Sequence, residues 1–178
     1  MGPLEMFERA ALTASGLARS VRPDQMGLPT PCSEWDVAAL LEHMAGGPMY
    51  LLGALEVGDA SVGVWPESAA VEAVVSRLGE PGALERRCMS PAGFEWSVAE
   101  AAAGTAMDQL VHTWDLAVAL GTDRRLDADV TAEVVSMFLP QMPDVGRQAG
   151  FVGPAVDVGQ GASPQDVLLG AMGRDPRR

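Results

Sequence analysis

Apolar residues recur every three or four positions over long stretches of this chain, which is the periodicity of amphipathic α-helices. The longest stretches cover residues 4–21, 34–57, 67–78, 97–120 and 128–139. Segments rich in proline and glycine separate them and favour loops. The pattern therefore predicts a bundle of four or more helices.

Several predicted helix ends carry residues that start or stop helices. Ser33 and Asp36 form a weakened capping box in front of the second helix, with Asp in place of the usual Glu or Gln. Gly121 fits a left-handed residue after the fourth helix. Ser163 followed by Pro164 is typical of the start of a short helix near the C-terminus.

The pattern is less regular between these helices. The Gly-Gly-Pro of residues 46–48 is expected to interrupt or kink the second helix. Residues 79–93 predict a short extended or irregular connection, and residues 146–164 a loop-like tail with an extended piece at 151–158. We expect an all-α fold with short extra helices and a loop-rich C-terminal segment, forming one domain over residues 1–178.

Charge and hydropathy narrow the functional class. The formal net charge is −12, and such an acidic surface repels nucleic acid. No stretch reaches the roughly 20 apolar residues of a membrane span, and the N-terminus lacks the basic and apolar regions of a secretory signal. We therefore expect a cytoplasmic protein whose partner is neither nucleic acid nor a membrane. Its two cysteines, Cys32 and Cys88, are expected to be reduced, small buried apolar residues.

The only two histidines, His43 and His112, both fall on predicted central helices, and Asp108 precedes His112 by four residues. Side chains at i and i+4 share one helix face. That spacing suits a carboxylate and an imidazole binding one metal ion, with His43 arriving from a neighbouring helix. Three protein ligands would leave a coordination position open, as in catalytic zinc sites.

A helical wheel puts Asp108, His112 and Asp115 in one narrow sector, which suggests that Asp115 could hold the other imidazole nitrogen. The spacing also fits an ordinary structural role. Asp108 and His112 would then be an exposed i,i+4 pair, His43 a hydrogen-bonded core residue, and Asp115 a helix-packing residue. Trp35 and Trp114 are interpreted as core residues.

Five segments carry a resemblance to a known family: residues 30–37 (TPCSEWDV), 40–43 (LLEH), 108–117 (DQLVHTWDLA), 151–156 (FVGPAV) and 173–176 (GRDP). Together they resemble the actinobacterial DinB-like family, which is related to the N-terminal domain of mycothiol-dependent maleylpyruvate isomerase. The resemblance implies a four-helix bundle that binds a divalent metal, commonly zinc.

By this resemblance His43, Asp108 and His112 are the metal ligands, although the isomerase has Glu where this chain has Asp108. The isomerase also uses a C-terminal domain that the chain does not resemble, so activity on maleylpyruvate is not implied. The resemblance implies a thiol transferase or isomerase that uses a low-molecular-weight thiol such as mycothiol on a small electrophilic substrate. Two alternatives stay open: a metal-dependent hydrolase using water, and a non-enzymatic bundle that binds a ligand or partner, often as a homodimer.

Overall fold

The computed structural model describes residues 1–55, 67–140 and 142–177. This part of the chain forms seven α-helices and one two-stranded sheet, so the prediction of a mostly helical protein is confirmed. The chain divides into two compact units, Met1–Arg124 and Arg125–Arg178. The finer predictions, a DinB-like four-helix bundle and one domain over residues 1–178, stay predictions.

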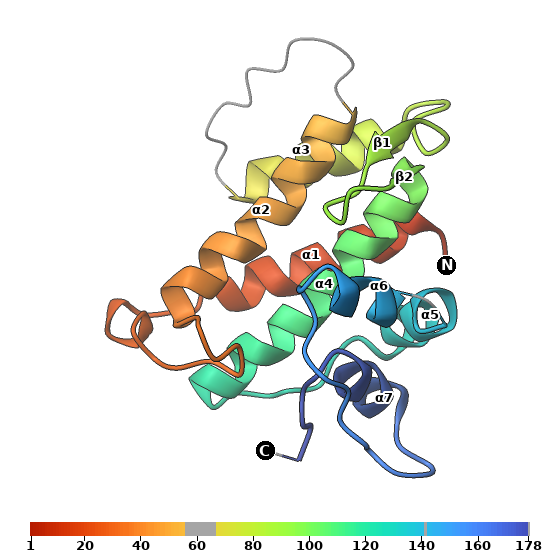
Figure 1. Cartoon of the computed structure of the whole chain (residues 1–178). Coiled ribbons are helices and arrows are strands. Elements are labelled where there is room, and N and C mark those ends of the chain that lie inside the picture. The colour runs from red at the N-terminus through yellow and green to blue at the C-terminus, as the bar shows by residue number, and fades with distance from the viewer. Residues whose placement is uncertain (56–66, 141, 178) are drawn as a thin grey trace. The chain divides into compact units, whose positions relative to one another are not determined.

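Four helices make up the body of the first unit: α1 (Pro3–Ala18), α2 (Val37–Leu55), α3 (Glu67–Leu78) and α4 (Val98–Leu120). Within this unit, α4 packs against α1 and α2, and α3 also packs against α1 and α2 (Figure 1). Most residues of α4 from Val98 to Ala117 are buried, and the buried ones include the polar residues Gln109, His112 and Asp115. A buried polar group needs a partner, so these side chains mark where to look for chemistry.

The start of α2 differs from the prediction. The helix begins at Val37, and Asp36 rather than Ser33 caps it, since the Asp36 Oδ1 accepts a hydrogen bond from the Ala39 N–H at 2.9 Å. The preceding segment is held away from helical geometry by an antiparallel bridge between Pro29 and Asp36. The predicted end of this helix, residue 57, lies outside the described residues.

Of the two outcomes expected at residues 46–48, the interruption is wrong, because α2 continues through Pro48 to Leu55, and the kink stays a prediction. The first helix is shorter than predicted and ends at Ala18, before the 3₁₀ turn at Pro23–Gln25. No helix in the described ranges is both long and apolar enough to cross a membrane.

The connection before α4 is a hairpin of β1 (Arg87–Met89) and β2 (Glu95–Ser97), which pair antiparallel with Cys88 opposite Trp96. The sequence predicted only a short extended or irregular segment here. The hairpin leads directly into α4, where Ser97 and Glu100 form a capping box.

The second unit contains α5 (Ala128–Phe138), α6 (Met142–Gln148) and α7 (Pro164–Ala171). The sequence did not predict α6, because proline usually ends a helix; Pro143 lies in the first turn of α6, where no backbone donor is needed. Residues 151–158 form no strand, and the extended piece expected there stays a prediction.

Two predicted helix ends are confirmed. Ser163 caps α7 by accepting a hydrogen bond from the Asp166 N–H, with Pro164 at the first helical position. Gly121 ends α4 in the left-handed conformation at φ 66°, where a side chain is unfavourable.

Candidate metal centre

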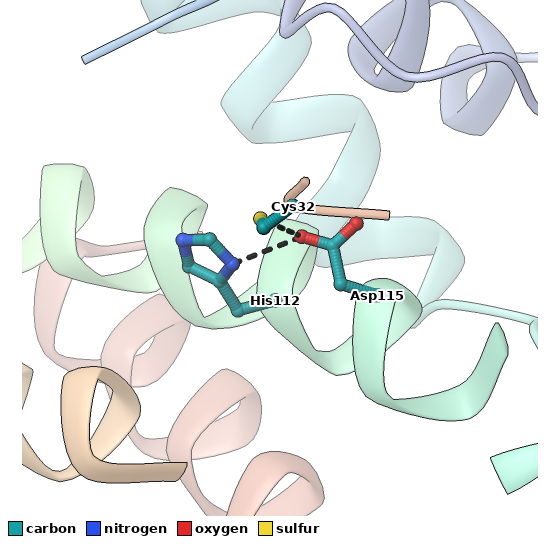
Figure 2. Close-up of side chains that lie close together, drawn as sticks. All are labelled: Cys32, His112 and Asp115. Carbon is teal, nitrogen blue, oxygen red and sulfur yellow. Dashed lines mark hydrogen bonds and ion pairs between the residues drawn. The ribbon is translucent and has the colours of Figure 1, made fainter. Parts of the chain in front are cut away.

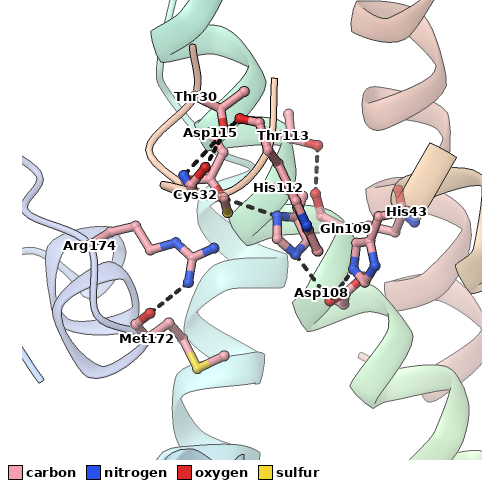
Figure 3. A network of polar contacts seen from close by, with 11 residues as sticks. Thr30, Cys32, His43, Asp108, Gln109, His112, Thr113, Asp115, Met172 and Arg174 are labelled. Atoms are coloured by element: carbon pink, nitrogen blue, oxygen red, sulfur yellow. Dashed lines mark hydrogen bonds and ion pairs between the residues drawn. The ribbon is translucent and has the colours of Figure 1, made fainter. Parts of the chain in front are cut away.

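The three predicted ligands lie together between α2 and α4 (Figure 3). The His43 Nε2 atom, from α2, lies 3.3 Å from both carboxylate oxygens of Asp108 on α4. One turn further along α4, the His112 Nε2 atom lies 3.4 Å from the Asp108 Oδ1 atom. One ligand atom from each residue therefore lies within 4.8 Å of the other two.

These spacings fit a shared cation better than direct hydrogen bonding. Zinc bonds of about 2.0–2.1 Å arranged tetrahedrally separate neighbouring ligand atoms by about 3.3–3.4 Å. A strong N⁺–H···O⁻ hydrogen bond is shorter, about 2.7–2.9 Å. The distances from Asp108 to the two imidazoles, 3.3 and 3.4 Å, match the edges of such a tetrahedron. Two imidazoles and one carboxylate also form a common zinc donor set.

The exposure of the three side chains differs in a way that matters for access. The side chains of His43 and Asp108 are 40% and 37% exposed, whereas that of His112 is 9% exposed. His112 thus forms the inner side of the group, and the other two face solvent. A ligand arriving from solvent can reach the common point of the three side chains past His43 and Asp108.

The inner imidazole is held from behind by a second set of polar contacts (Figure 2). The His112 Nδ1 atom lies 3.0 Å from the Oδ2 atom of Asp115, a fully buried residue. The Cys32 thiol donates to the same oxygen at 3.4 Å. A carboxylate that accepts from Nδ1–H leaves the Nε2 lone pair available on the other side of the ring. The sequence left two roles open for Asp115, holding the imidazole of His112 or packing the helix.

Cys32 differs from its prediction as a small buried apolar residue, because it is half-buried and its thiol has a polar partner. Its sulfur, the His112 imidazole and the Asp115 carboxylate also lie close enough to be a second candidate ligand group. The 3.0 Å separation of Nδ1 and Oδ2 is that of a hydrogen bond and is shorter than a tetrahedral edge. We therefore assign this group to the support of His112.

Trp35 is a site residue that sequence reasoning missed. Its ring centroid lies 4.6 Å from that of His43 and 5.6 Å from that of His112, so the indole contacts both imidazoles. The same residue packs against the core cluster that includes Val37 and Leu40, which partly supports its prediction as a core residue. Trp114 is buried as predicted.

The loop before α2 places Trp35 and Cys32 at the site. The Thr30 hydroxyl donates to the Trp35 carbonyl at 2.8 Å and accepts from the Cys32 N–H at 3.1 Å. The Trp35 N–H donates to the Cys32 carbonyl, which closes a turn. In the sequence, both residues stand close to the α2 cap and within residues 30–37, one of the segments that carry the family resemblance.

Electrostatic interactions within the group favour an ionised Asp108 carboxylate beside a protonated His112 imidazole. Burial opposes the charged form of the Asp108 carboxyl, but the neighbouring imidazoles of His112 and His43 outweigh it and lower its pKa well below the usual range. Burial likewise opposes the imidazolium of His112, but the Asp108 charge, together with hydrogen bonds to Asp108 and Asp115 and one with Cys32, raises its pKa well above the usual value. We therefore expect His112 to be protonated in the metal-free protein at neutral pH.

A cation that binds through the His112 Nε2 atom must displace this proton. Since the pKa of His112 is raised in the metal-free protein, we expect zinc binding at pH 7 to release about one proton. Apparent affinity should then rise with pH up to the raised pKa. Calorimetric titration in buffers of different ionisation enthalpy measures the released protons. Binding without proton release at this pH would contradict the assignment of His112 as a ligand.

Comparison with known proteins shows the family of this chain. Residues 7–87 match the family described as "Mycothiol maleylpyruvate isomerase N-terminal domain". Two uncharacterized proteins of Mycobacterium tuberculosis, from the CDC 1551 / Oshkosh and H37Rv strains, are each 33% identical over 186 residues, covering 99% of this chain and 100% of the relative. The chain belongs to the mycothiol maleylpyruvate isomerase N-terminal domain family. No solved structure matches it significantly.

The match to this family covers one part of the site directly. Its residues include Cys32, Trp35 and His43, and it ends before α4, which carries Asp108 and His112. The two halves of the candidate centre thus rest on different observations. The family match overlaps the α2 half of the centre, and the geometry of the folded unit brings the α4 half to it.

Proposed function

We propose that His43, Asp108 and His112 bind a divalent cation, zinc being the expected ion, and that the protein uses it to activate a low-molecular-weight thiol. The thiol would be transferred to a small electrophilic substrate or would assist its isomerisation. The observation that carries the proposal is the spacing of the three side chains, 3.3 and 3.4 Å from Asp108 to each imidazole. The family description, which names mycothiol, supports the choice of a thiol.

The charge of the donor set also favours a thiolate. A bound divalent cation lowers the pKa of a coordinated thiol, so that the thiolate is present near neutral pH. Two neutral imidazoles and the single negative charge of Asp108 leave one positive charge uncompensated. An anionic fourth ligand is therefore preferred over a neutral one.

Other residues of the chain orient the proposed ligands around the open coordination position. Asp115 fixes the orientation of His112 through Nδ1, and Trp35 lies against both imidazole rings, restricting the rotation of His43. The half-exposed His43 and Asp108 leave the approach from solvent open. No protein nucleophile is needed in this scheme, since the cosubstrate thiol supplies it.

Cobalt substitution tests the proposal directly. None of the three proposed ligands contains sulfur, so the Co²⁺-loaded protein should show no thiolate-to-cobalt charge-transfer band until mycothiol is added. We expect the band to appear on addition of mycothiol and to be absent with S-methylated mycothiol. Cys32→Ser is the matched control, because a band that survives in this variant cannot arise from the nearby Cys32 thiol.

The remaining outcomes decide against the proposal. Tag-free protein that neither contains a divalent cation nor takes one up would overturn metal binding altogether and favour a non-enzymatic binding role. A loaded protein that gives no band with thiols, but hydrolyses small esters or amides without them, would identify a metal-dependent hydrolase.

A further inference from the structure

Pro48 stands in the interior of α2, yet the helix is continuous. Proline has no backbone N–H, so the carbonyl four residues earlier, that of Met44, loses its helical donor. Met44 is 1% exposed, and a buried carbonyl without a partner is unfavourable. A donor from elsewhere is therefore required at this point of α2.

Gln109 of α4 supplies that donor. Its side-chain Nε2 donates to the Met44 carbonyl at 2.7 Å, and the residue is 2% exposed. A short bond between two buried groups is a well-defined link between the helices. The pattern of apolar residues along α4 contains nothing that singles out Gln109.

Gly47 allows the two helices to approach closely enough for this bond. A Cβ atom at position 47 would lie 2.9 Å from the Gln109 Nε2 atom and 3.0 Å from the Thr105 Cγ2 atom. A Cβ atom there would force the Gln109 amide and the Thr105 methyl group to shift. The close approach therefore depends on a residue without a side chain.

We propose that Gln109 is a positioning residue: by replacing the donor that Pro48 lacks, it locks α2 to α4 at the height of the candidate metal centre. Each end of the bond is one residue from a proposed ligand, because Met44 follows His43 and Gln109 follows Asp108. The bond thereby sets the separation of His43 from Asp108 and His112. The part of this inference that concerns metal rests on the proposed function.

The position of the bond explains why the ligand spacing needs it. His43 is the only proposed ligand on α2, and its side chain is 40% exposed, so apart from the contact with Trp35 little packing holds the imidazole. The separation of the two helices then decides whether its Nε2 atom meets the other ligands. A shift of about 1 Å between supporting elements is enough to impair a site of this kind.

A double-mutant cycle on Gln109 and Pro48 tests the link. Gln109→Met removes the donor at similar side-chain length, and Pro48→Ala restores a backbone N–H that can donate to the Met44 carbonyl. We expect Gln109→Met to lower the urea midpoint clearly when Pro48 is present and much less in the Pro48→Ala background. Additive effects on the midpoint would overturn the claim that Gln109 substitutes for the missing donor.

Metal affinity separates positioning from mere stabilisation. Gln109→Met should weaken Co²⁺ binding about tenfold, as loss of supporting contacts commonly does. Pro48→Ala in the same chain should restore stability without restoring Co²⁺ affinity, since the helices are still unlinked. Affinity that is unchanged in Gln109→Met, or recovers together with stability, would overturn the positioning role.

Thr113→Val is the matched control in α4. The Thr113 hydroxyl donates to the Gln109 backbone carbonyl within the same helix at 2.6 Å, so its loss does not touch the link to α2. Its Co²⁺ affinity should equal that of the wild type, and a tenfold loss there would overturn the assignment to Gln109. If the wild type bound no Co²⁺, the proposed function and the positioning role would both fail, while the urea cycle would still decide whether Gln109 replaces the missing donor.

Discussion

Replacing His112 with alanine is expected to weaken zinc binding by roughly 100- to 1,000-fold, because apparent zinc-binding energies of about 10–16 kcal/mol are shared among four ligands in small structural sites. His112 is the inner ligand, 3.4 Å from Asp108 and almost fully buried, so water replaces it poorly. Competition with a chromogenic chelator measures the affinity. The same loss should appear in thermal stability.

Thermal unfolding measures how much zinc stabilises the folded protein. Zinc at about 1,000 times its dissociation constant stabilises the wild-type protein by about 4 kcal/mol, and at the same zinc concentration this gain should fall to about 0.4–1.4 kcal/mol in His112→Ala. His43→Ala should behave in the same direction. Since the chain has only these two histidines, the double variant has no imidazole left. A His112→Ala protein that folds and still binds zinc as the wild type does would refute the proposed centre.

The apolar periodicity and the capping residues predicted much of the helical structure. The apolar repeat located α3 and α4 closely, and Gly121 and Ser163 marked helix ends where the structure has them. Helix geometry also made Asp108 and His112 neighbours, because four residues are close to one turn. That local part of the site follows from spacing alone.

The non-local parts of the site did not follow from the pattern. From a loop, Trp35 reaches the two imidazoles and Cys32 reaches Asp115, and a loop has no period from which its direction can be predicted. The cap lies at Asp36 rather than Ser33 because the segment before it forms a turn within the bridge between Pro29 and Asp36. Local capping rules do not include such a bridge.

Pro48 shows a second reason why the sequence alone does not predict the whole structure. The rule that proline breaks a helix interior assumes that the orphaned carbonyl stays unpaired. Here the partner is Gln109, which lies far away in sequence on α4, and the helix remains intact. The exception could be recognised only once α2 and α4 were seen side by side.

The second large effect is expected at Asp115, the fully buried carboxylate behind His112. Its Oδ2 atom accepts from the His112 Nδ1–H at 3.0 Å and from the Cys32 thiol at 3.4 Å. Asp115→Asn keeps the shape and removes the charge, and its amide can present a donor where Nδ1–H needs an acceptor. We expect zinc affinity to fall about 10- to 100-fold, the usual cost of losing a carboxylate that supports a histidine ligand.

Nitrogen NMR of the histidine rings measures directly which ring nitrogen carries the proton, and only His43 and His112 contribute signals. In the zinc-loaded wild type, His112 should carry its proton on Nδ1, and Asp115→Asn should weaken or lose that preference. Cys32→Ser is the matched control, because serine still donates to Asp115 and should bind zinc nearly as the wild type does. Unchanged affinity and an unchanged Nδ1 proton in Asp115→Asn would show that Asp115 only packs α4, and that the orientation of His112 has another cause.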